Sequence, residues 1–194
     1  MKTTIKTLLA ALLLLGISCT KETLHPPSAA SAQTQDNSTL QTTGHYIGER
    51  FGGGIIFYIS KAGIHGLIAD TVDLGSFLWF NEKFTKTGAT GTAVFTGKAN
   101  TRKIILSQGK AGSYAALECA KSTRSGYTDW YLPSKDELNE LYKQRNVVGG
   151  FANYIYWSSS ELNYRKAWLH YFFNGYPHDV TKDYYYPVRA VRAY

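Results

Sequence analysis

The sequence predicts an α+β domain, with strands at both ends of the folded region and short helices between them. Near its start, the continuous apolar and β-branched run over residues 55–59 is typical of a buried strand. In the middle, residues 133–138 combine a proline, a serine and a glutamate in the order that begins a helix. After residue 154, aromatic and polar residues alternate as in strands. We expect the first and last strands to meet in one antiparallel sheet.

The first 18 residues carry the signs of an export signal. Lys2 and Lys6 precede a short apolar run over residues 8–17, which is too short to span a bilayer. Small residues then precede Cys19, so we predict a lipoprotein signal over residues 1–18 and acylation of the Cys19 thiol by palmitate-type chains. The alternative is an ordinary secretory signal followed by an incidental cysteine.

A polar tether and a folded head are expected after this signal. Residues 19–44 are rich in Thr, Ser, Ala, Gln and Pro, and such a segment cannot bury enough apolar surface to offset its chain entropy. The remaining residues, 45–194, have the length of one domain. We therefore predict a folded head that is attached to a membrane through a disordered tether and a lipid anchor.

The predicted head is basic. Of the 21 Lys and Arg residues and the 14 Asp and Glu residues, three and two respectively precede residue 45, which leaves a net charge of about +6. A basic exported head predicts acidic partners, such as sulfated or uronic glycans, anionic envelope polymers or nucleic acid. No nucleic-acid recognition motif is visible, and export argues against that partner. Ordinary solvation of the charges is the alternative.

The predicted elements of the first half follow in chain order. Residues 55–59 form a strand, residues 61–63 turn, and residues 65–69 pair back as a hairpin. Residues 77–80 are a short strand candidate. Residues 85–97, which are rich in Gly and Thr, are expected to form an exposed loop.

Three helices are expected in the middle of the head. The first covers residues 100–106, and the second covers residues 113–121, whose Ala-rich apolar face includes Cys119. Because Cys119 is the only cysteine of the head, it has no internal disulfide partner, and we expect the thiol to be buried. Pro133 precedes the third helix, and residues 134–137 form a Ser-x-x-Glu capping box.

Strands return in the last forty residues. Alternating patterns over residues 154–158 and 168–173 predict two strands, and Asn174-Gly175 is a typical hairpin turn. A last strand is expected over residues 188–193. Its alternation is imperfect, which indicates a β-bulge.

Exposed basic and tyrosine-rich segments are the predicted binding residues. Lysine and arginine would meet sulfate or carboxylate groups, and tyrosine supplies a flat face with a hydroxyl at its rim. Ordinary solvation is the alternative for each cluster. The predicted residues are Lys98, Arg102 and Lys103, then Arg165 and Lys166, and then Tyr176, His178, Lys182, Tyr184, Tyr185 and Tyr186 in a long loop after Gly175.

A second set of residues is predicted to be structural. The tryptophans are candidates for sugar stacking, but core packing is favoured because their surroundings are apolar. Asp129 is expected to fix a turn, and the last two arginines to pair with Asp129 or Glu161. The hydroxyls of residues 158–160 are expected to bond the backbone, because no Gly-x-Ser-x-Gly elbow or His/Asp partner accompanies them. The structural set is Asp129, Trp130, Pro133, Trp157, Glu161, Trp168, Arg189 and Arg192.

Several of these segments together resemble the Legionella collagen-like protein C-terminal domain family. The resemblance covers nearly the whole head, and the order of its motifs is specific. The matching stretches are Asn100-Thr101, the Ala-rich helix with Cys119, Asp129-Trp130-Tyr131-Leu132-Pro133-Ser134, Glu137-Leu138, Tyr156-Trp157-Ser158-Ser159-Ser160-Glu161, Ala167-Trp168 and Val188-Arg189-Ala190-Val191-Arg192.

The resemblance implies a C-type-lectin-like fold, akin to the formylglycine-generating enzyme, on a bacterial surface. The namesake of the family is an adhesin that binds sulfated polysaccharides. Many relatives have a second cysteine in the final Val-Arg strand, where this chain has Ala190, so Cys119 lacks that partner. A lipoprotein signal before such a domain also resembles envelope proteins of the Bacteroidetes type, which implies the outer membrane.

The resulting expectation is a non-enzymatic, lipid-anchored adhesin-like protein that binds acidic or sulfated polysaccharides. The alternative is a structural or accessory protein-interaction component of a surface assembly, and a hydrolase is third. Formylglycine-generating chemistry needs paired copper-binding thiolates, which a single cysteine does not supply. We predict no cofactor and no metal, because the histidines show no close ligand spacing. The Glu-Pro-Asn and Trp-Asn-Asp triplets of calcium-binding lectins are absent, and a calcium site in which Asn174, Asp179 and Asp183 meet on one loop is the less favoured alternative.

Overall fold

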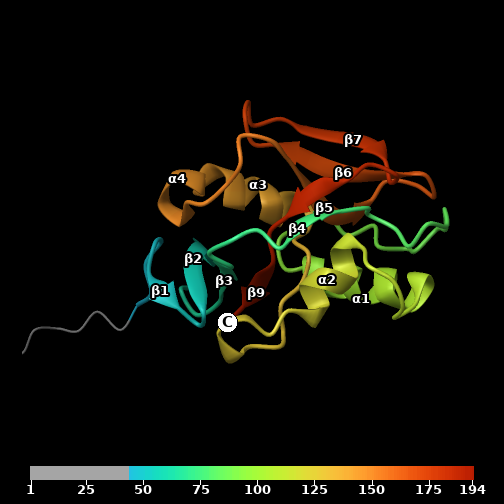
Figure 1. Ribbon diagram of the computed structural model, residues 1–194. Helices are drawn as coiled ribbons and strands as arrows, with labels where there is room; N and C mark the ends of the chain where they lie inside the picture. Colours follow the sequence, from blue (N-terminus) through green and yellow to red (C-terminus); the bar gives the residue numbers. More distant parts are fainter. Residues whose placement is uncertain (1–43) are drawn as a thin grey trace, which may run out of the picture. The chain divides into compact units, whose positions relative to one another are not determined.

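Strands from opposite ends of the head pair in one antiparallel sheet, as the sequence predicts. The sheet has the order β1-β2-β3-β9. The hairpin of β2 (Gly54–Ile59) and β3 (Gly66–Ala69) carries the short β1 (Arg50–Phe51) on one side. The last strand, β9 (Val191–Ala193), lies on the other side of β3, with Leu67 opposite Ala193 (Figure 1).

The computed structural model describes residues 44–194, which lie within one compact unit. The predicted signal over residues 1–18, the predicted lipidation site at Cys19 and almost all of the predicted tether lie outside the described residues. No helix of the described part has the length and apolarity needed to cross a bilayer.

Two further antiparallel sheets complete the β-structure. One pairs β4 (Gly75–Phe77) with β8 (Tyr186–Val188), and the other has the order β5-β6-β7. Its strands are β5 (Ile155–Glu161), β6 (Lys166–Tyr171) and β7 (Pro177–Thr181). The predicted strand over residues 77–80 is therefore displaced toward the N-terminus. The expected long loop after Gly175 is wrong, because a tight turn leads directly into β7.

The predicted single strand over residues 188–193 is in fact two strands in two sheets. The break falls at Arg189, whose side chain is fully buried. Its guanidinium pairs with Asp73 at 2.7 Å and donates to the backbone oxygens of Asp70, Gly149 and Gly150. Between the strand that ends at Val188 and the strand that begins at Val191, the chain passes from one sheet to the other, and the buried Arg189 lies at this crossing.

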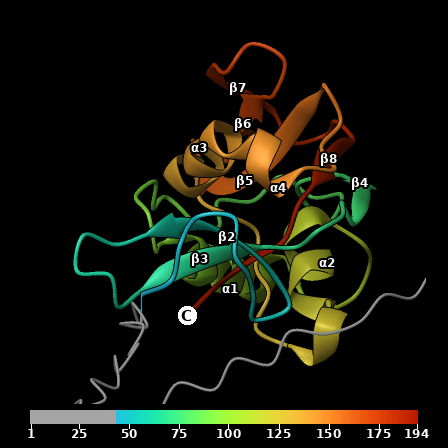
Figure 2. The same cartoon turned by 90° about the vertical axis from the view of Figure 1, so that its left-hand side faces the viewer.

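The helices lie between the strand regions in the chain and pack on both sides of β5. They are α1 (Gly97–Gln108), α2 (Ala115–Lys121), the 3-10 turn η1 (Arg124–Gly126), α3 (Lys135–Lys143) and α4 (Arg145–Val148). Helix α1 contacts α2 and β5, whereas α3 contacts β5 and β6 (Figure 2). The predicted helix over residues 100–106 is thus too short at both ends.

The start of α3 has the predicted capping box. The Ser134 hydroxyl accepts from the Glu137 backbone N–H at 3.3 Å, and the Glu137 carboxylate accepts from the Ser134 N–H at 2.7 Å. The same carboxylate accepts from the Phe95 N–H at 2.7 Å. One buried side chain therefore caps α3 and holds the chain that leads into α1.

Tryptophan side chains fill the centre of the head. Trp79 and Trp157 are fully buried, and each donates its indole N–H to a backbone oxygen, of Ser158 and Phe77 respectively. Trp130 is also buried and donates to the Arg124 oxygen. Trp168 differs from the expected core residue, because it is partly exposed and the Lys135 ammonium lies 4.0 Å from its ring centroid.

The segment of residues 85–97 is not the freely exposed loop that its composition predicts. Ala89 is fully buried in the core. The Glu161 carboxylate, at the end of β5, accepts backbone N–H groups of Thr87 and Gly88 at 2.9 Å each. Gly88 has a positive φ of 73°, and a Cβ at Gly91 would lie 2.8 Å from the Thr96 side chain, so the composition reflects backbone conformation and packing and not solvation.

Glu161 pairs with Lys182 and not with an arginine. Both side chains are fully buried, and the Lys182 ammonium lies 2.6 Å from the Glu161 carboxylate. Lys182 also donates to the backbone oxygens of Thr85 and Tyr164, and it lies 4.3 Å from the Trp79 ring centroid. Burial lowers the pKa of Lys182, and Glu161 opposes that effect. Lys182 is therefore not a ligand-binding residue, because its ammonium group is buried and paired with Glu161.

Replacing Lys182 by methionine is expected to destabilise the head strongly, because Glu161 would remain buried without its cation. Removing one partner of a buried ion pair costs about 3–5 kcal/mol. Lys166→Met is the matched control, since the Lys166–Asp179 pair is partly exposed and such pairs contribute less than about 1 kcal/mol. Urea unfolding at neutral pH compares the two variants. Equal losses would contradict a special role for the buried pair.

A buried histidine makes stability depend on pH. His170 in β6 packs against Tyr142 and Phe172, and neither of its ring nitrogens has a partner among the described residues. Burial lowers its pKa from 6.5 to about 4. Between pH 6.5 and about pH 4, His170 is therefore protonated in the unfolded chain but remains neutral in the folded chain. The contribution of His170 to the free energy of unfolding is complete above pH 6.5 and falls by about 3 kcal/mol as the pH drops to 4.

His170→Phe is expected to remove this part of the pH dependence, because a phenyl ring does not titrate. The comparison must be with the wild type, since burial raises the pKa of Asp70 and Glu137 and these groups act in the opposite direction. The measurement is the free energy of unfolding from pH 7 down to pH 4. Parallel curves for the two proteins would show that His170 is not the group responsible.

Candidate functional site

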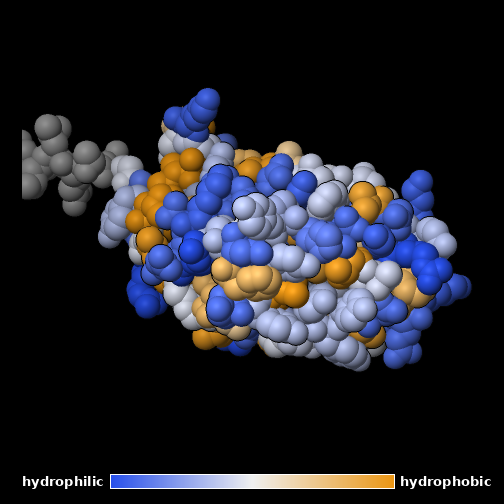
Figure 3. Space-filling view, turned by 90° about the horizontal axis from the view of Figure 1, so that it is seen from above, coloured by the Kyte–Doolittle hydropathy of each residue, from blue (hydrophilic) through white to orange (hydrophobic). Residues whose placement is uncertain are grey.

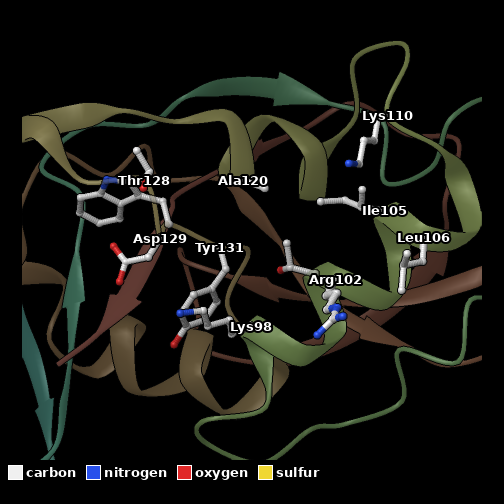
Figure 4. Close-up of a pocket in the computed structure, with 11 residues that line it drawn as sticks. Lys98, Arg102, Ile105, Leu106, Lys110, Ala120, Thr128, Asp129 and Tyr131 are labelled. Atoms are coloured by element: carbon white, nitrogen blue, oxygen red, sulfur yellow. The ribbon is translucent and has the colours of Figure 1, made fainter.

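An open groove of about 420 Å³ lies between α1 and the extended segment of residues 128–131. Helix α1 supplies one wall with Lys98, Arg102 and Leu106, and Asp129 lies in the opposite wall (Figure 4). The extended segment is held in place by a bridge between Tyr131 and Val191 of β9, which exchange both backbone hydrogen bonds. The groove is thus built on the junction between the helices and the terminal sheet.

Three cations line this groove. Lys98 and Arg102 fall with Leu106 on a four-residue repeat, so these three side chains share one face of α1. Lys110 reaches the groove from the loop that follows Gly109, outside the helix. All three cations are exposed, and none forms an ion pair with another described residue. Their charges are therefore free to meet a ligand.

The carboxylate that lines the groove, Asp129, is already neutralised. The Arg192 guanidinium grips both of its oxygens, at 2.7 and 3.1 Å. Burial acts to raise the pKa of Asp129, but the hydrogen bond and the charge of Arg192 outweigh it and the net pKa is lowered. Asp129 therefore ties the segment to β9. The predicted pairing with an arginine is found for Arg192, whereas Arg189 pairs with Asp73 and not with Asp129 or Glu161. The groove keeps a positive charge.

Apolar side chains form part of the groove wall. Leu106 is 73% exposed, and Ile105 lines the groove beside it. Trp130 also borders the groove, but its ring is buried, so it offers no face for sugar stacking. The site combines a cationic rim with a mostly apolar lining.

The family model of the Lcl C-terminal domain matches residues 78–192. The chain belongs to the Lcl C-terminal domain family. The match includes every residue of the groove and confirms the resemblance carried by the sequence motifs. No curated protein matches the chain. The hairpin of β2 and β3 precedes the matched region, although β9 pairs with it.

The predicted binding residues of this Lcl C-terminal domain fall into separate regions. Lys98 and Arg102 line the groove, whereas Lys103 is not among the lining residues and donates to the Gly88 oxygen at 3.1 Å. The remaining residues of the set belong to the β6–β7 side, which lies away from α1 in Figures 1 and 2. The structure therefore does not assemble them into one site.

On the β6–β7 side, the predicted residues have differing environments. Arg165 is exposed, with its guanidinium 5.1 Å from the Phe84 ring centroid, and Lys166 is paired with Asp179 at 3.0 Å. The other exposed members of the set are Tyr176, His178, Tyr184 and Tyr185.

Sequence reasoning missed Leu106 and Lys110 as parts of the groove. For Leu106, the available signal was its four-residue spacing from Lys98 and Arg102. It was hidden because the predicted helix began at residue 100, whereas α1 begins at Gly97. Lys110 follows Gly109, which has a positive φ of 86°, so no helical spacing could predict its place.

The nucleophilic side chains of this Lcl C-terminal domain are engaged elsewhere. The hydroxyls of Ser158 and Ser160 donate to the backbone oxygens of Trp168 and Gly91, each at 2.7 Å. Burial raises the pKa of the Cys119 thiol, which keeps it protonated and unreactive. Within residues 44–194, no group of three or more His, Cys, Asp or Glu side chains is placed to hold a metal ion.

Proposed function

We propose that this protein is a lipid-anchored cell-envelope protein that binds acidic or sulfated polysaccharides without a catalytic step. The observation that carries the proposal is the groove, in which Lys98, Arg102 and Lys110 are free and the facing carboxylate is already paired with Arg192. Sulfate and carboxylate groups accept charge-assisted hydrogen bonds from such cations. The net positive charge of the chain adds long-range attraction for a polyanion.

An open groove with flexible cations favours a polymer over a small anion. Each exposed lysine or arginine must lose side-chain freedom to hold one anionic group, so a single contact contributes little. A chain with repeated anionic groups occupies several cations at once, and each contact after the first is intramolecular. Many copies of the protein on one membrane would strengthen the attachment in the same way.

The second candidate is an accessory component of a surface assembly that binds another protein through the same groove. The exposed Leu106 and the neighbouring Ile105 favour this alternative, because a hydrated sulfated chain gains little from apolar contact. Salt separates the two candidates. Attraction between exposed charges is screened as salt increases, whereas burial of apolar surface is not.

Removing the groove cations together is expected to abolish most binding to sulfated chains. The triple variant Lys98→Gln, Arg102→Gln and Lys110→Gln should bind heparin or dextran sulfate at least about tenfold more weakly at low salt, which equals about 1.4 kcal/mol. Wild-type binding should also fall steeply as salt rises. Both are measured by calorimetry or surface plasmon resonance.

The matched control removes the same charge from exposed lysines outside the groove. Lys61→Gln, Lys83→Gln and Lys86→Gln lie on other loops and should retain most of the binding. Equal weakening of the two triple variants would indicate a general charge effect and would contradict the groove. Salt-insensitive capture of an envelope protein would favour the second candidate.

The lipid anchor has a separate test at Cys19. In a Gram-negative host, the full chain is expected in the membrane fraction, because several acyl chains anchor a protein stably. Cys19→Ser should move it to the soluble fraction of the envelope. Cys119→Ser is the control, since the buried thiol has no role in anchoring. Membrane retention of the Cys19→Ser protein would argue against lipidation.

A further inference from the structure

Four tyrosines from three separate segments converge on the side of the head that carries β5, β6 and β8. The Tyr186 ring lies 6.1 Å from the Tyr154 ring and 5.8 Å from the Tyr184 ring, measured between centroids. The rings of Tyr184 and Tyr186 are nearly parallel, at 19°. Tyr171 lies opposite Ile155, the neighbour of Tyr154, in the β5–β6 pair, and it packs against the same core cluster as Tyr186.

Tyr171 extends this cluster along the end of β6. Its ring stacks on Phe173 at 5.1 Å and 18°, and it lies 5.5 Å from the His178 ring. Tyr154, Tyr184 and Phe173 are 48%, 53% and 51% exposed, so about half of each side chain faces solvent. We call the four tyrosines Tyr154, Tyr171, Tyr184 and Tyr186, with Phe173 and His178, the aromatic platform.

The aromatic platform is held rigidly from below. Tyr186 packs edge-on against Trp157 at 5.1 Å, and Trp157 is fully buried with its indole N–H bonded to the Phe77 oxygen. Tyr186 also belongs to β8, where it lies opposite Phe77. Rings that are ordered before a ligand arrives lose little conformational freedom when it binds.

The tyrosine hydroxyls of the platform are free. None of the four forms a hydrogen bond with another residue in the described part of the chain, whereas the hydroxyls of Tyr114, Tyr131 and Tyr156 do. The platform therefore offers flat apolar faces together with unused hydrogen-bonding groups at their edges. A ligand that matches it must itself be flat and apolar on one face and rich in hydroxyls at its rim.

The size of the platform argues against a protein partner. An aromatic side chain covers about 150–250 Å² when fully buried. Because Tyr154 and Tyr184 are about half exposed and Tyr171 and Tyr186 are less exposed than that, the four tyrosines offer no more than about 400 Å². A stable protein interface needs about 800 Å² on each partner. In the view from above, over β6 and β7, apolar residues form small separate groups among hydrophilic ones and no broad apolar patch (Figure 3).

Charge near the platform argues against a polyanion. Lys166 is paired with Asp179, and Lys182 is buried with Glu161, so neither lysine offers a free cation. Asp183, next to Tyr184, is exposed. The platform therefore differs in chemistry from the basic groove.

We propose that the aromatic platform is a second binding site, for the pyranose rings of a neutral polysaccharide. The C–H face of a sugar would lie on the exposed rings, and its hydroxyls would exchange hydrogen bonds with the free phenols. This site goes beyond the polyanion groove of the proposed function and does not depend on it. Together the two sites would allow the head to bind an envelope surface that carries both acidic and neutral polysaccharides.

The test is affinity electrophoresis of the full-length protein in gels that contain laminarin, mannan, xyloglucan or hydroxyethylcellulose. At least one polysaccharide is expected to retard the protein, equally at low and high salt. Tyr154→Ala and Tyr184→Ala should each weaken the retardation about threefold to tenfold. Tyr184→Phe should lose less, because it keeps the ring. Tyr46→Ala is the control, since Tyr46 is 66% exposed and forms no aromatic pair with a described residue.

The groove variant separates the two proposals. The triple variant Lys98→Gln, Arg102→Gln and Lys110→Gln should keep its retardation by the neutral polysaccharide while it loses heparin. No retardation by any of the four polysaccharides would overturn the platform proposal and leave the groove unaffected. Retardation that Tyr154→Ala and Tyr184→Ala do not change would overturn it as well.

Discussion

The charge of Glu161 is buried, and it can remain there because the Lys182 ammonium and two backbone N–H groups surround it. An unpaired carboxylate in this position would cost several kcal/mol, so the three partners must all be in place. This requirement brings the end of β5, the segment after β7 and the segment of residues 85–97 together. That last segment leads directly into α1, so the wall of the groove depends on the same buried charge.

A second buried carboxylate completes the support of the groove. Glu137 caps α3 and accepts the Phe95 N–H just before α1 begins. Asp129 and Arg192 then tie the opposite wall to β9. Glu161, Glu137 and Asp129 are thus all paired within the fold, whereas the cations of the groove form no ion pair with a described residue. The positive character of the groove is thus a consequence of how the fold uses its acidic side chains.

Cationic and aromatic side chains lie close together in the sequence, but the fold separates them into the basic groove and the aromatic platform. Residues 164–186 contain one arginine and two lysines among several tyrosines, which suggests one site that uses both. In the fold, Lys166 and Lys182 are paired or buried, and Tyr171, Tyr184 and Tyr186 gather near Tyr154. In our proposals, a ligand is therefore attracted by charge at the groove on α1 and contacts flat rings at the aromatic platform.

The sequence by itself determined the α+β class, the β2–β3 hairpin and the capping box at Ser134, because hydrophobic periodicity and turn chemistry are local. The order of its motifs indicated the family, by resemblance. The finer likeness to C-type lectins stays a prediction. Only the tertiary structure decided that Lys182 is buried, that the last strand divides at Arg189, and that Lys110 joins the groove. Each of these depends on a partner far away in the chain, and a lysine that will be exposed looks the same in a sequence as one that will be paired and buried.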